Sequence, residues 1–367
     1  MEALERRVLE ALDLEGLVAF VCDLIAIRSL VGEETPAQER VAAEMDRCGL
    51  AVDLWSLDLD RLRRHPAYSA EVERTQALGV AGVLGENRGG RSLILNGHVD
   101  VVPPGDEAQW SYPPWQGTVV GDLGRGQGRV YGRGAVDMKG GLACALYAAR
   151  ALRDAGVRLE GRLLIQSVAG EEDGGVGTLA AVQRGYRADG AVVVEPTELM
   201  IAPAQAGALN FRITVPGLSA HACLREEGVS AIDKFVPLYQ ALKDLERARN
   251  AGLQDPLYAG YDLPYALSVG TLQAGDWASS VPDRLEFGGR YGVAVGEDLD
   301  AARRRLEETI ERAAQADPWL RDHPPQVEWW GGQFAPASIP VDHPLVRAVG
   351  DAFREANGTE AVSYTHL

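Results

Sequence analysis

The chain has 367 residues, too many for one ordinary hydrophobic core, so two domains are expected. Its 53 Asp and Glu residues outnumber 36 Lys and Arg residues, which gives a formal net charge of −17. A surface this acidic excludes nucleic acids and anionic membranes as partners. It does not exclude an anionic small substrate, because bound metal ions can reverse the local field inside a cleft.

No segment of the sequence indicates export or membrane insertion. Residues 1–12 are charged and helix-like, without the apolar stretch of a secretory signal, and no run reaches the ~20 apolar residues of a membrane span. Four scattered cysteines without a Cys-x-x-Cys pair are typical of reduced thiols: Cys22, Cys48, Cys144 and Cys223. We therefore expect a cytoplasmic protein.

Residues 1–205 alternate between helical and strand-like segments. Apolar residues at helical spacing predict helices over 17–28 and from Asp137 to Gly156. Short apolar runs predict strands over 92–96, 162–169 and 190–194. This alternation predicts an α/β domain with a doubly wound, mostly parallel sheet and helices on both faces. In such sheets, ligands gather at the carboxyl ends of the strands.

The pattern changes near residue 206. The predicted elements are then a strand over 209–215, a helix after Ser230, strands near 267–272 and 284–294, and a helix over 298–315. This order predicts a small α+β domain of one sheet and one helical layer, inserted over residues 206–325. The first domain would then continue over 326–367, with a helix that begins near Val341.

The first predicted strand leads directly to His98 and Asp100. Residues i and i+2 of a strand point to the same side, so the Asp100 carboxylate can hold one ring N–H while the other nitrogen binds a metal ion. A His-x-Asp pair by itself is more often an ordinary surface or core pair. The carboxylates that follow in the sequence favour the metal site.

Four further carboxylates stand near the ends of predicted elements. Asp137 begins a helix after a Gly-rich turn, where it can cap the helix, bridge two metal ions, or do both. Glu171 and Glu172 are adjacent, so one can bind metal while the other takes a proton from water, although alone they would suit a solvated acidic turn. Glu195 ends an apolar strand, where a buried carboxylate needs a partner. With His98, these residues predict a two-metal hydrolase site.

These residues lie in four motifs that occur in a fixed order: NGHVD (96–100), GRGAVDMKGG (132–141), AGEED (169–173) and VVVEPT (192–197). In these motifs and in the inserted domain, the chain resembles the M20 family of zinc metallopeptidases and amidohydrolases, from about residue 17 to its end. Within the family it is most similar to acetylornithine deacetylase-like and succinyl-diaminopimelate desuccinylase-like deacylases. The resemblance implies a phosphorylase/hydrolase-like fold of the zinc exopeptidase type, with the insert as a lid and dimerisation domain.

The resemblance also implies a role for each motif residue. Glu171 would be the general base, and Asp100 would orient His98. Two divalent metal ions would bind, with zinc expected and cobalt or manganese as alternatives. Their implied ligands are His98 and Glu195 for the first ion, Glu172 for the second, and Asp137 as the bridge.

Three residues of the insert carry implied roles as well. His221 would stabilise the developing oxyanion in the active site of a partner subunit, which implies a homodimer formed through the lid. Arg290 would hold a substrate carboxylate, for which Arg geometry is suited. Ser279 stands where many relatives carry Asn, which affects substrate selectivity. The alternative for His221 is a loop histidine without a role, and for Arg290 an ordinary exposed strand residue.

The end of the chain departs from the family pattern. The family's second zinc also binds a late histidine, and His366 lacks the sequence surroundings of that ligand. We therefore expect a chain that is truncated at its C-terminus and whose second metal site is incomplete. We interpret residues 362–367 as foreign to the family.

The resulting prediction is a metalloenzyme that hydrolyses the amide bond of small N-acylated amino acids. One alternative is a dipeptidase or carboxypeptidase of the same family, acting on short peptides. An alternative of another class is a catalytically silent binding or assembly protein, against which the intact set of site residues argues.

Overall fold

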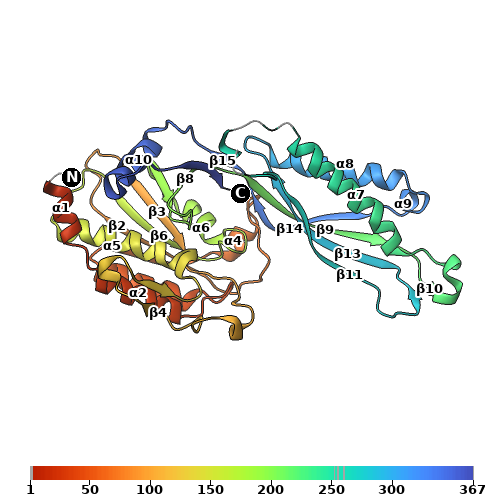
Figure 1. Ribbon diagram of the computed structural model, residues 1–367, viewed down its shortest axis with the longest axis horizontal. Helices are drawn as coiled ribbons and strands as arrows, with labels where there is room; N and C mark the ends of the chain where they lie inside the picture. The colour runs from red at the N-terminus through yellow and green to blue at the C-terminus, as the bar shows by residue number, and fades with distance from the viewer. Residues whose placement is uncertain (1–2, 252, 254–255, 259–260, 367) are drawn as a thin grey trace. The chain divides into compact units, whose positions relative to one another are not determined.

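The computed structural model describes residues 3–251, 253, 256–258 and 261–366, and the chain divides into two compact units between Leu199 and Met200 (Figure 1). The predicted division at residues 205 and 325 stays a prediction. Among the described helices, none combines the length and the apolar character that crossing a bilayer requires.

The elements of the first unit follow the predicted alternation. Its helices are α1 (Ala3–Glu10), α2 (Leu14–Ala26), α3 (Thr35–Arg47), α4 (Leu59–Arg63), α5 (Gly140–Asp154) and α6 (Val176–Arg184). Its strands are β1 (Ala51–Ser56), β2 (Leu78–Leu84), β3 (Leu93–His98), β4 (Thr118–Val120), β5 (Arg129–Tyr131), β6 (Leu163–Val168) and β7 (Gly190–Val193). The three predicted strands and two predicted helices correspond to β3, β6, β7, α2 and α5, with ends shifted by about three residues or fewer.

Five strands of this unit form one sheet in the order β1-β2-β6-β3-β7. β3 pairs in parallel with β6 and β7, whereas β2 is antiparallel to both β1 and β6. Only β2 therefore opposes the other four strands, and the predicted mostly parallel sheet is confirmed. The register places His98 opposite Val168, so the carboxyl ends of β3 and β6 meet at one edge of the sheet.

Helices cover both faces of this sheet. On one face, α2, α3 and α5 form a core cluster with Leu163 and Ile165 of β6. The intervening Leu164 points to the opposite face because side chains alternate along a strand. There α6 contacts β2 and β6, and a smaller cluster joins α4 to α6 through Leu62 and Val176.

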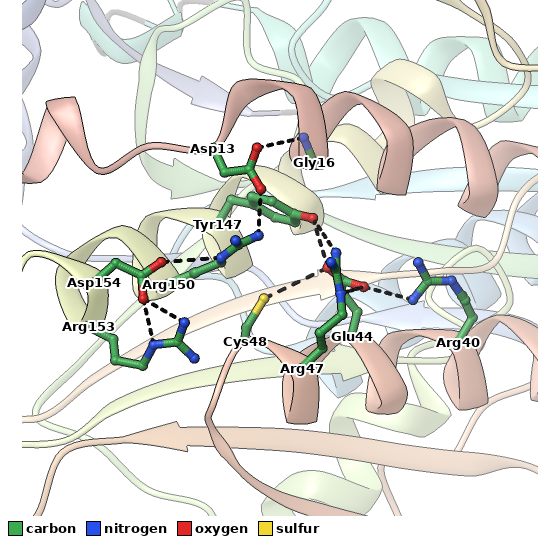
Figure 2. A network of polar contacts seen from close by, with 10 residues as sticks. All are labelled: Asp13, Gly16, Arg40, Glu44, Arg47, Cys48, Tyr147, Arg150, Arg153 and Asp154. Carbon is green, nitrogen blue, oxygen red and sulfur yellow. Dashed lines mark hydrogen bonds and ion pairs between the residues drawn. The ribbon is translucent and has the colours of Figure 1, made fainter.

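A polar network joins α3 to α5 beside the first cluster (Figure 2). Its centre is Glu44, whose side chain is only 1% exposed. Tyr147 donates to one carboxylate oxygen at 2.8 Å, and Arg40 and Arg47 donate to the other at 3.0 Å. Burial opposes ionisation of Glu44, but the hydrogen bonds from Arg47 and Tyr147 prevail and lower its pKa. The network fixes α3 against α5 with a charge that is fully paired.

The second unit contains the predicted insert and the end of the chain. Its helices are α7 (Ala231–Asn250), α8 (Leu299–Gln315), α9 (Pro318–Asp322) and α10 (Pro344–Asn357). Its strands are β8 (Ile201–Gln205), β9 (Gly207–Pro216), β10 (Ala220–His221), β11 (Leu267–Ala274), β12 (Ser280–Val281), β13 (Arg284–Val293), β14 (Gln326–Phe334), β15 (Ala337–Ser338) and β16 (Ser363–His366).

The main sheet of this unit is antiparallel, in the order β11-β13-β9-β14. Figure 1 shows α7 and α8 beside this sheet. Alternate apolar residues of its strands, such as Phe211 and Phe287, form one core with Leu238 of α7 and Leu306 of α8. The predicted layer of one sheet and one set of helices is therefore present. β14 joins this sheet by pairing with β9 at residues 326–329 and again at residues 333–334.

Candidate metal centre and active site

His98 is fixed by its position at the end of β3. Its side chain is 1% exposed, and Nδ1 lies 2.9 Å from the backbone carbonyl oxygen of Asp100, but 3.7 Å from the nearer carboxylate oxygen. The expected orienting contact from Asp100 is therefore made by its carbonyl group rather than by its carboxylate. The carboxylate instead accepts a hydrogen bond from the backbone N–H of Glu172 at 2.9 Å. Asp100 thus connects the ends of β3 and β6.

The other ring nitrogen of His98 faces a group of carboxylates. Nε2 lies 3.0 Å from Oδ1 of Asp137, 3.8 Å from Oε1 of Glu195 and 3.9 Å from Oε2 of Glu171. Two sets of residues each offer ligand atoms that lie within 4.8 Å of one another: His98 with Glu171 and Glu195, and His98 with Asp137 and Glu172. The structure thus brings together all five residues from four sequence motifs. Which glutamate is the base and which the ligand stays a prediction.

The electrostatics of this cluster favour a bound cation. Burial and neighbouring carboxylates raise the pKa of Glu172 and of Glu195 to about 7, and burial also raises the pKa of Glu171. Burial opposes the charged form of His98, but the carboxylates, Asp137 first, raise its pKa to about 10. Several acids crowded around one imidazole repel one another unless positive charge lies between them. A donor set of carboxylate oxygens and one imidazole suits divalent zinc, manganese or cobalt.

A buried ion-pair network supports the turn that carries Glu171 and Glu172. Asp173 follows them directly, and its carboxylate pairs with Arg74 and accepts from the backbone N–H of Val72 at 3.1 Å. Arg74 also pairs with Glu34 at 2.9 Å. The side chains of Arg74, Glu34 and Asp173 are at most 2% exposed. The network ties the glutamate turn to two other segments of the chain.

Lys139 holds the Asp137 segment in a similar way. Its side chain is fully buried, and Nζ donates to the carbonyl oxygens of Leu24 at 2.8 Å and Ile27 at 2.9 Å. These carbonyl groups lie at the C-terminal end of α2, which favours a cation. Burial lowers the pKa of Lys139 to about 8. Lys139 lies in the GRGAVDMKGG motif, but its position in the sequence gave no sign of its carbonyl partners.

Two of the three candidate residues in the insert lie together. His221 is exposed on β10, where its Nδ1 accepts from the backbone N–H of Cys223 at 3.1 Å. Ser279 is also exposed, and its carbonyl oxygen accepts from the backbone N–H of Ala222 at 3.0 Å. Both residues therefore lie near Arg284, at which β13 begins.

Arg290 lies apart from this pair. It is exposed in β13, where it stands between Ser268 of β11 and Asn210 of β9. It is six positions along the strand from Arg284, the first residue of β13, which corresponds to ~20 Å at about 3.3 Å per residue. Arg290 thus lies along β13, away from the start of that strand, near which His221 and Ser279 lie.

Comparisons with known proteins give matches over most of the chain. The sequence model described as peptidase family M20/M25/M40 matches residues 94–366. The N-formyl-4-amino-5-aminomethyl-2-methylpyrimidine deformylase of Halalkalibacterium halodurans is 31% identical over 328 residues, which cover 84% of this chain and 71% of that protein. The deformylase of the same name from Bacillus subtilis is 28% identical over 350 residues, covering 88% and 76%.

A solved structure shows the same fold. The M20 family metallo-carboxypeptidase Sso-CP2 from Sulfolobus solfataricus has a TM-score of 0.73, with 14% identity, covering 100% of this chain and 86% of that chain. At this level of identity the likeness concerns the fold alone.

The carboxylate cluster predicts that zinc stabilises the fold more at pH 8 than at pH 5.5. Zinc must displace the protons that Glu172 and Glu195 hold below a pKa of about 7, so its apparent affinity falls as the pH decreases. Without metal, ionisation of these groups destabilises the fold as the pH rises from about 4.5 through about 7. Thermal unfolding with and without zinc measures the difference. In His98→Ala, zinc should no longer stabilise the fold more at pH 8 than at pH 5.5. Equal stabilisation of the unaltered protein by zinc at both pH values would contradict the prediction.

The buried network predicts that Asp173→Asn impairs both stability and turnover. Removing one charge leaves Arg74 incompletely paired in the interior, which costs about 3 kcal/mol, and frees the turn that carries both glutamates. We expect kcat of the zinc-loaded, still folded protein to fall at least about ten-fold because the glutamates lose their positions. Asp60→Asn, which disrupts an exposed pair with Arg63, is the matched control. Unchanged kcat per bound zinc in Asp173→Asn would show that the network does not position the site.

Proposed function

The chain belongs to peptidase family M20/M25/M40, and from this premise we propose that it removes a short acyl group from a small N-acylated amine. As a family member it is a metal-dependent hydrolase of amide bonds. The observation that carries the proposal is that five residues converge at one edge of the sheet: His98, Asp137, Glu171, Glu172 and Glu195.

The five residues are proposed to hold two divalent metal ions, with zinc favoured and cobalt or manganese as alternatives. Such ions lower the pKa of a water molecule and polarise an amide carbonyl group. The two groups of ligand atoms share His98, whose Nδ1 is already held by the carbonyl oxygen of Asp100. That contact fixes the tautomer in which Nε2 is free to bind metal.

Glu171 is proposed as the general base. It accepts a proton from the attacking water, and the water oxygen forms a bond with the amide carbon. The carbon–nitrogen bond then breaks, and Glu171 returns the proton to the leaving amine, which yields a carboxylic acid and a free amine. Burial raises the pKa of Glu171, which supports this role because a stronger base takes up a proton more readily.

Two substrate classes compete within this reaction. The sequence motifs favour N-acylated amino acids, as in acetylornithine deacetylase-like enzymes, and the exposed guanidinium of Arg290 could bind their carboxylate. The two deformylases, each matching more than four fifths of the chain, favour an N-formyl aminomethylpyrimidine. We place the N-formyl substrate first because it is supported by similarity across both units. A dipeptidase or carboxypeptidase activity ranks behind both, and the intact site argues against a catalytically silent binding protein.

His221 is proposed to act in the active site of a second copy of the chain. A small substrate spans much less than the ~20 Å that separates the start of β13 from Arg290. Arg290 and His221 of one insert would therefore contact two different substrate molecules, each in a separate active site. This supports a homodimer in which each subunit supplies its His221 to the active site of the other. The cytoplasm is the proposed location, supported by four cysteines that form no disulfide.

The proposed base is tested with Glu171→Gln. We expect kcat to fall by about 10²–10⁴-fold, because the amide cannot take the proton, while zinc content per chain is retained. Glu39→Gln, an exposed glutamate on α3, is the control. Rates with the N-formyl aminomethylpyrimidine, N-acetylornithine and a dipeptide, measured on the unaltered protein, rank the substrate classes. Activity retained by Glu171→Gln would exclude it as the base, and no hydrolysis of any amide would overturn the proposed function.

The exchanged histidine is tested by mixing two impaired proteins, Glu171→Gln and His221→Ala, after subunit exchange. A mixed dimer regains one site that has both groups, so random exchange should restore about a quarter of the unaltered activity. Mixing His221→Ala with more of itself is the control. Absence of recovery in mixtures shown to contain mixed dimers would contradict the assignment.

A further inference from the structure

The segment after β3 forms a pocket that contains none of the five metal-site residues. It has a volume of about 480 Å³ and is lined by residues 104–106 and 109–112 together with Tyr131 of β5. This volume lies within the range of about 300–1,000 Å³ typical of small-molecule sites. A single-ring compound would fit it.

Three aromatic rings line this pocket, and the structure holds each of them in place. Trp110 donates its indole N–H to the carbonyl oxygen of Pro104 at 3.0 Å. The rings of Tyr112 and Tyr131 lie 4.6 Å apart, tilted by 42°. The Arg133 guanidinium lies 5.1 Å from the centre of the Trp110 ring and donates to the carbonyl oxygen of Pro103 at 3.2 Å. Rings fixed in this way offer flat contact surfaces at little entropic cost.

The polar part of the lining favours a positively charged or N–H-donating ligand. Among the described residues that line the pocket, Asp106 is the single charged one, although the Arg133 guanidinium lies on the Trp110 ring beside them. One carboxylate oxygen of Asp106 accepts from the backbone N–H of Ala108 at 3.0 Å, and the other accepts from Gln109 at 3.1 Å. Each oxygen can accept a further hydrogen bond. Aromatic faces also attract cations.

We propose that this pocket binds a planar aromatic ring that carries an amino group and a positive charge. The flat ring would lie against the aromatic side chains, and its N–H groups would point to Asp106. A flat anion would meet the Asp106 carboxylate, and a non-planar amine would lose the ring contacts. Both should therefore bind more weakly.

The pocket lies close in the chain to the metal site. Pro104 is four residues from Asp100, so their Cα atoms are at most about 14 Å apart. The inference does not rest on hydrolysis, because binding can be measured without turnover. It therefore stands or falls separately from the proposed function.

The test is isothermal titration of the zinc-loaded protein with 4-aminopyridine, a flat amine that is charged at neutral pH. Cyclohexylamine and benzoate are the comparison ligands. We expect 4-aminopyridine to bind at least about ten-fold more tightly than either, and Trp110→Leu to weaken it about ten-fold. Asp106→Asn, at an exposed position, should weaken it several-fold without affecting folding. Trp277→Leu, which alters a tryptophan that is 72% exposed and outside the pocket, should leave binding unchanged.

Several results would overturn the proposal. One is equal affinity for 4-aminopyridine and cyclohexylamine. Another is unchanged affinity in both Trp110→Leu and Asp106→Asn. A third is binding that persists in Trp110→Leu but disappears when zinc is removed, which would place the ligand on the metal ion. Absence of measurable heat at millimolar 4-aminopyridine would count against the proposal equally.

Discussion

The organisation of the first unit depends on the mutual repulsion of the carboxylates around His98. Asp137, Glu171 and Glu195 approach one imidazole nitrogen within 3.9 Å, and Glu172 completes the second group of ligand atoms. Such a group is costly for the fold unless cations neutralise it. The parallel pairing of β3 with β6 and β7 makes the convergence unavoidable, because the carboxyl ends of all three strands meet at one edge. The same geometry that destabilises the fold creates a candidate metal site.

Buried cations outside the site hold in place the segments that carry the site residues. Arg74 lies behind the glutamate turn with Asp173 and Glu34, and Lys139 anchors the Asp137 segment to the end of α2. Each of these side chains is almost completely buried, so each contact is strong and specific in direction. These contacts hold the site residues in position while the site gains or loses protons or metal ions.

The candidate residues of the second unit are distributed differently. His221 and Ser279 lie near one end of the antiparallel sheet, whereas Arg290 lies well inside it. A rigid sheet of this kind can carry groups for two separate sites. The aromatic pocket after β3 adds a further place at which ligand chemistry, rather than the metal site, could determine specificity.

The sequence by itself determined the family and the mostly parallel sheet, and it predicted the five residues that the structure brings together as a candidate metal site. It could do so because each site residue lies in a short motif next to an apolar run, and the spacing of that run predicts a strand or a helix. The residues are His98, Asp137, Glu171, Glu172 and Glu195. Only the tertiary structure decided which atoms hold these residues. The carbonyl oxygen of Asp100 orients His98, β14 pairs with β9, and Arg74 joins segments about one hundred residues apart. Such contacts depend on backbone direction and long-range packing, which no local pattern of residue types encodes.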